Sequence, residues 1–69
     1  MVRKKFILDR YQLRVAMAYK SISMSELSEL CGISRQTLYN AASNKVGVSP
    51  KTLGKIANAL EVEIEELLI

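Results

Sequence analysis

The chain has no histidine, and its 69 residues include one cysteine, one proline and three glycines. Without histidine, imidazole acid–base catalysis and histidine-ligated metal sites are excluded. Cys31 stands alone, so it can neither close an internal disulfide nor build a zinc site, and we expect a small buried hydrophobe beside a turn. The serines fit positions that cap helices rather than a catalytic arrangement. The sequence therefore predicts a protein that is not an enzyme and that requires no metal or cofactor.

Long apolar runs are also missing from the sequence. No stretch is long enough to span a membrane, and the apolar run in residues 1–10 is too short for a signal peptide. Because 49% of the residues are hydrophobic and helix breakers are few, we expect a folded chain, and 69 residues fit one small domain. The sequence thus predicts a single cytoplasmic domain without contact with a membrane.

Acidic residues are missing from a long internal segment. No Asp or Glu lies between Leu30 and Leu60. Residues 56–69, in contrast, contain four glutamates and no lysine or arginine. In so small a chain such a gap can arise by chance. It also favours contact with phosphates, because an acid in this segment would repel the DNA backbone. The basic residues within the gap are Arg35, Lys45, Lys51 and Lys55.

A recurring pair of apolar residues marks the starts of five helices. An aliphatic residue is followed five positions later by leucine, and a capping residue comes directly after the first member. This is the hydrophobic staple, in which the residue before the N-cap packs on the fourth helical residue. The pairs are Leu8–Leu13, Ile22–Leu27, Ile33–Leu38, Val48–Leu53 and Val62–Leu67. The predicted fold is all-α, a compact five-helix bundle with helices at about 9–20, 23–31, 34–43, 49–60 and 63–68.

Residues 22–45 have the layout of a helix-turn-helix. A capping box at Ser23 and Glu26 begins one helix, and Gly32 supplies the left-handed residue that ends it. Ser34 then caps a second short helix. In a helix-turn-helix, this second helix enters the major groove of DNA. Its apolar stripe consists of Leu38, Ala41 and Ala42.

Two stretches carry a family resemblance through the order and spacing of their residues. The first is formed by Ser23, Glu26, Leu27, Gly32, Ile33, Ser34, Arg35, Thr37 and Leu38. The second is Thr52-Leu53-x-Lys55-Ile56-Ala57-x-Ala59-Leu60-x-Val62, followed by Ile64-x-Glu66-Leu67-Leu68. With them, the chain resembles the phage repressor and Cro-like helix-turn-helix family, also called the xenobiotic-response-element type. The resemblance covers about 60 of the 69 residues and implies a lambda-repressor-like fold.

The outer face of the predicted helix 34–43 carries groups that suit base edges. Gln36, Tyr39 and Asn40 lie opposite the apolar stripe, and Arg35 flanks them. Gln and Asn can bond bidentately to adenine, and Arg can bond to guanine. A merely solvated face, the alternative interpretation, would more often carry Glu and Lys. The resemblance implies base contacts at Arg35, Gln36 and Asn40, and we add Tyr39, which suits either a thymine methyl group or a phosphate.

Phosphate contacts are predicted around the same helix. The free amides at the start of the helix 23–31 attract anions. The resemblance implies that the loop after the helix 34–43 lies on the sugar-phosphate backbone. The residues predicted to contact phosphates are Ser25, Ser34, Thr37, Ser43, Asn44, Lys45 and Lys51.

The chain departs from the family's pattern in three ways. Met24 replaces a common glutamine that braces the recognition helix, and Asn44 replaces a glycine. Many members also pair an arginine in the first helix with a glutamate late in the third, and these positions are Met17 and Ala42 here. Loss of both charges together avoids an uncompensated charge. We therefore expect Met17 and Ala42 to be buried neighbours.

The protein is predicted to regulate transcription by binding a specific sequence of double-stranded DNA. We expect a repressor that blocks access to a promoter. A homodimer on a palindromic operator is expected, because one small domain has limited contact area. The apolar end of the helix 63–68 either forms the dimer contact or closes the core of the monomer. The domain covers residues 9–69, and residues 1–8 are predicted to be a basic arm along DNA or a frayed end.

The rival hypothesis is a protein-binding adaptor or antirepressor that keeps the fold without binding DNA. The acidic C-terminal segment and Met24 favour this alternative. Binding of random duplex DNA at two salt concentrations separates the two hypotheses, because only a DNA-binding protein shows a salt-dependent affinity.

Overall fold

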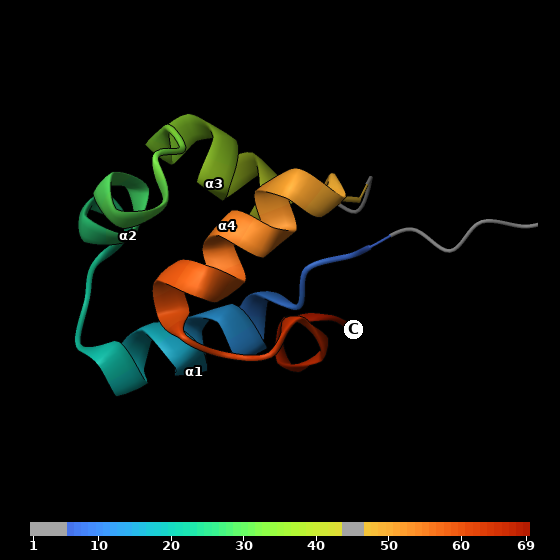
Figure 1. Cartoon of the computed structure of the whole chain (residues 1–69), viewed down its shortest axis with the longest axis horizontal. Coiled ribbons are helices and arrows are strands. Elements are labelled where there is room, and N and C mark those ends of the chain that lie inside the picture. Colours follow the sequence, from blue (N-terminus) through green and yellow to red (C-terminus); the bar gives the residue numbers. More distant parts are fainter. Residues whose placement is uncertain (1–5, 44–46) are drawn as a thin grey trace, which may run out of the picture.

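The computed structural model describes residues 6–43 and 47–69, which form four α-helices and one short 3-10 helix (Figure 1). No helix in this part of the chain is long and apolar enough to cross a bilayer. Helices form at the five predicted places. The last of them is a single 3-10 turn, so the structure is a bundle of four α-helices and not the expected bundle of five. The elements are α1 (Arg10–Lys20), α2 (Met24–Cys31), α3 (Arg35–Ser43), α4 (Pro50–Leu60) and η1 (Ile64–Leu67).

Each helix begins where a side chain satisfies backbone N–H groups that have no partner within the helix. The Ser23 hydroxyl accepts a hydrogen bond from the Glu26 amide at 3.2 Å, and the Glu26 carboxylate accepts one from the Ser23 amide at 2.9 Å. This is the predicted capping box, which contributes about 1 kcal/mol. The equivalent caps are Asp9 on the amides of Tyr11 and Gln12, Ser34 on that of Thr37, and Ser49 on that of Thr52.

The helices α1, α2 and α4 end at residues in the left-handed conformation. Gly32 has φ of 69° and closes α2, as its lack of a Cβ predicts. Ser21 and Glu61 close α1 and α4 with φ of 55° and 57°, although both carry a side chain. Such residues cost about 1–2 kcal/mol in this conformation, so packing of the following segments must hold them there.

The core lies around α4, which runs between α1 and the α2–α3 pair (Figure 1). All five leucines that end the apolar pairs are buried, and the first members are buried or half-buried against them. The pairing read from the sequence therefore describes the packing as well as the helix starts. The fully buried large side chains are Leu13, Leu27, Leu38, Leu53, Ile56, Leu60 and Leu67.

The N-terminal segment pairs with the C-terminal end. Leu8 and Leu68 form an isolated antiparallel β-bridge, and the Ile69 amide donates to the Ile7 carbonyl at 3.1 Å. Because Leu68 must be extended to make this bridge, the last helix stops after one tight turn. Leu8, which the sequence places at the end of the basic arm, is a core residue with 3% of its surface exposed.

Candidate nucleic-acid interface

The turn between α2 and α3 is held by one serine. The Ser28 hydroxyl donates to the Ile33 carbonyl at 2.6 Å, and the Ser28 carbonyl accepts from the Ile33 amide at 3.2 Å. Cys31 is buried beside this turn, as predicted, and Leu38 is the one fully buried residue of α3. These contacts set the direction of α3 relative to α2 while most of the surface of α3 stays open.

The four residues predicted to contact bases are all exposed on α3. The Gln36 Nε2 donates to the Asn40 Oδ1 at 3.1 Å, one helical turn away. This bond leaves the side-chain oxygen of Gln36 and the side-chain NH2 group of Asn40 free, so the pair presents both an acceptor and donors to solvent. Tyr39 is 53% exposed and lines a hollow together with Arg10 and Arg14 of α1.

Arg35 links the starts of the two helices. Its Nη1 donates to the Ser25 Oγ at 3.1 Å, and both side chains are exposed. Within residues 6–43 and 47–69, the single ion pair joins Lys20 and Glu61, so Arg35 has no carboxylate partner there. A guanidinium has five N–H donors, and those that Ser25 does not use remain available.

Three predicted phosphate-contacting hydroxyls also have partners within α3. The Ser34 Oγ accepts from the Thr37 amide at 3.1 Å and donates to the Thr37 Oγ1 at 2.9 Å. The Ser43 Oγ donates to the Tyr39 carbonyl at 2.6 Å. All three residues are exposed, so they reach the surface while they stabilise the helix. Contact of these hydroxyls with phosphate stays a prediction.

The start of α4 adjoins α3. Lys51 is exposed in the first turn of α4. A hollow of about 190 Å³ separates the two helices, and the predicted loop residues Asn44 and Lys45 lie outside the described residues. The lining includes hydroxyls that the sequence reasoning did not assign to the site, because they were explained as caps. The residues around the hollow are Thr37, Asn40, Ala41, Gly47, Val48, Ser49 and Thr52.

The two positions that lack the family's ion pair lie on one hollow. Met17 of α1 and Ala42 of α3 are both half-buried and line a hollow of about 470 Å³, together with Met24. Both residues line one hollow, but they are half-buried rather than buried as predicted, and their mutual contact stays a prediction. Arg10 and Arg14 of α1 line the same hollow. From the sequence, Arg14 was only a weak candidate for a phosphate contact and Arg10 was not one, because the crossing of α1 and α3 is not encoded locally.

Comparison with known proteins relates the chain to one family and to two solved structures. A family model described as a Cro/C1-type HTH DNA-binding domain matches residues 12–69. The restriction-modification controller protein C.AhdI from Aeromonas hydrophila has a similar structure, with 29% identity, a TM-score of 0.74, and coverage of 86% of this chain and 89% of that one. The hypothetical transcription factor NHTF from Neisseria has the same fold, with 21% identity, a TM-score of 0.73, and coverage of 100% and 85%. No curated protein matches the chain with significance.

Proposed function

We propose that this chain regulates transcription by placing α3 in the major groove of a specific DNA site. The premise is its family, because the chain belongs to the Cro/C1-type helix-turn-helix DNA-binding domains. The observation that carries the proposal is the outward face of α3, where Arg35, Gln36, Tyr39 and Asn40 are exposed together. Asparagine, serine and tyrosine are mediocre helix formers, so their choice for an exposed face favours recognition over helix stability.

The hydrogen bond between Gln36 and Asn40 supports base reading at one position. The free carbonyl oxygen of Gln36 and the free amino group of Asn40 form an acceptor–donor pair. Adenine presents the complementary set in the major groove, a donor at N6 and an acceptor at N7. The pair is already oriented by its own hydrogen bond, so less side-chain entropy is lost on binding.

Phosphate contacts would orient the domain without reading sequence. Arg35 and Ser25 join the starts of α2 and α3, and Lys51 lies at the start of α4. The absence of acids between Leu30 and Leu60 keeps α3 and the start of α4 free of carboxylates that would repel a phosphate. Repression would follow by occlusion, because a protein seated on a promoter excludes polymerase from the same DNA.

A homodimer on a palindromic operator is part of the proposal. The end of the chain supports it, since Ile64 and Ile69 are 39% and 86% exposed, whereas Leu67 closes the core of the monomer. Two copies related by a two-fold axis would place two α3 helices in successive major grooves. The similarity to a controller protein of a restriction-modification system supports a regulatory role.

Fluorescence anisotropy with a labelled random duplex tests the proposal. If about three to five phosphates are neutralised per subunit, the logarithm of affinity should fall with the logarithm of salt with a slope of roughly −3 to −5 per subunit. A folded protein that binds no duplex at low salt would contradict the proposal and favour the protein-binding adaptor. Sites selected from a random DNA pool then supply the cognate sequence, and their symmetry tests the dimer.

A further inference from the structure

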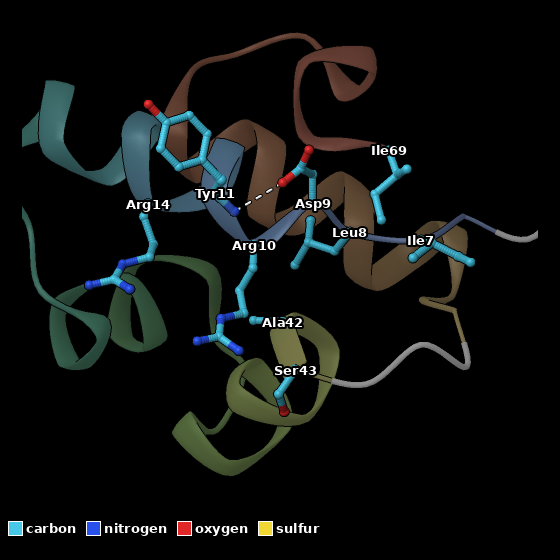
Figure 2. Close-up of a pocket in the computed structure, with 9 residues that line it drawn as sticks. All are labelled: Ile7, Leu8, Asp9, Arg10, Tyr11, Arg14, Ala42, Ser43 and Ile69. Atoms are coloured by element: carbon cyan, nitrogen blue, oxygen red, sulfur yellow. Dashed lines mark hydrogen bonds between the residues drawn. The ribbon is translucent and has the colours of Figure 1, made fainter.

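Two arginines of α1 lie beside the C-terminal end of α3. Arg10 and Arg14 are one helical turn apart and therefore share a face of α1. Both line a hollow of about 490 Å³ with Ala42 and Ser43, and both also line the neighbouring hollow that Tyr39 borders. Figure 2 shows the Arg10 guanidinium extending toward Ala42 and Ser43, while the Tyr11 ring points away on the other side of α1.

No carboxylate of the described residues neutralises these two arginines. The one ion pair in residues 6–43 and 47–69 joins Lys20 and Glu61, at the other end of α1. Asp9 is adjacent in sequence, but its carboxylate accepts hydrogen bonds from the Tyr11 and Gln12 amides and points away from the Arg10 guanidinium (Figure 2). Two exposed guanidinium groups with no internal partner form a concentrated positive site.

The end of α3 gives this positive site a role. The C-terminal end of a helix carries about half a negative charge, which repels a phosphate, and the last turn of α3 contains no basic residue. Phosphates that approach this end of α3 therefore need positive charge from residues outside α3. Arg10 and Arg14 supply that charge from α1, beside Ala42 and Ser43.

We propose that Arg10 and Arg14 bind DNA backbone phosphates at the C-terminal end of α3, opposite the end where Arg35 and Ser25 lie. This inference rests on the proposed function and extends the interface to α1. Guanidinium groups suit the task, because they form paired hydrogen bonds with phosphate oxygens. Contacts at both ends of α3 would fix its tilt in the groove, which contacts at one end alone cannot do.

Single charge-removing variants test the assignment. Arg10→Gln and Arg14→Gln should each reduce the steepness of the salt dependence by about one unit, on cognate and random duplex alike, and the double variant by about two. The matched control is Lys20→Gln, which removes the same charge from α1 six residues beyond Arg14 and should leave the slope unchanged. The three side chains are exposed or nearly so, and circular dichroism melts should confirm that each variant is folded.

The outcomes separate this inference from the function on which it rests. Slopes for Arg10→Gln and Arg14→Gln that equal the Lys20→Gln slope would overturn it, even if Gln36→Ala still weakens cognate binding. Loss confined to the cognate site would also overturn it, because a phosphate contact cannot distinguish sequences. If the folded wild type binds no duplex, the proposed function itself fails together with this extension.

Discussion

The two helices α3 and α4 distribute their residues in opposite ways. α4 buries Leu53, Ile56, Ala57 and Leu60, and its pattern is that of an amphipathic core helix. α3 buries Leu38 alone, and its remaining surface carries amides, hydroxyls, a phenol and a guanidinium. The difference shows that α4 supplies much of the core, whereas α3 is attached to the core mainly through Leu38.

This division separates stability from recognition. A substitution on α4 should change the free energy of unfolding and affect DNA binding only through the folded fraction. A substitution on the outer face of α3 should change DNA binding and leave unfolding almost untouched, since exposed positions typically shift stability by less than about 0.5 kcal/mol.

The largest expected effect is on the scaffold. Leu53→Ala removes a side chain that is 1% exposed and leaves a cavity, so unfolding should become easier by about 2–5 kcal/mol. Leu30→Ala is the matched control, because Leu30 is 60% exposed on α2 and should lose less than about 0.5 kcal/mol. Urea denaturation followed by circular dichroism measures both. Equal losses at the two leucines would show that the core does not lie around α4.

A smaller effect is expected across the seam between α1 and α3. Ala42→Glu places a carboxylate in the half-buried hollow that Met17 lines, and should destabilise the fold by about 1–2 kcal/mol. Met17→Arg in the same chain supplies an opposite charge and should recover part of that loss. A double-mutant cycle from urea denaturation gives the coupling energy, which contacting residues show at about 0.5 kcal/mol or more. Strict additivity would mean that the two side chains do not meet.

The smallest effect concerns pH and again belongs to the scaffold. The hydrogen bond from Lys20, together with its positive charge, holds the pKa of Glu61 below its ordinary value. A lowered pKa in the folded state stabilises the protein above the unfolded carboxyl pKa of about 4.3, and this stabilisation is lost as pH falls through the folded value. Lys20→Gln should return the pKa of Glu61 toward its ordinary value in an NMR titration. A pKa of Glu61 that is the same in both proteins would contradict the ion pair.

The sequence predicted those parts of the structure that depend on neighbouring residues. Ser23, Ser34 and Ser49 cap helices as expected, because capping involves groups three residues apart. The end of the chain was predicted as a helix and is a 3-10 turn. Its geometry depends on the bridge between Leu8 and Leu68, which are 60 residues apart in sequence, so no local pattern encodes it.

In the candidate interface, too, the local features were predictable from the sequence and the contacts between helices were not. The exposed positions on α3 follow from helical periodicity once Leu38 is assigned to the core. The link between Arg35 and Ser25 and the approach of Arg10 and Arg14 to α3 depend on how helices cross. Crossing angles are set by side-chain packing across the whole core, and a single sequence does not reveal them.

The central claim is that the outer face of α3 reads base edges, and paired affinities on cognate and random duplex test it most directly. Gln36→Ala and Asn40→Ala should each lose about 1–3 kcal/mol of binding on the cognate site and much less on random duplex. Lys51→Ala should weaken both DNAs alike, and melting temperatures should barely change, since all three residues are exposed. The account predicts a lower cognate-to-random ratio for the two amide variants, and an unchanged ratio would show that α3 is not the reading helix.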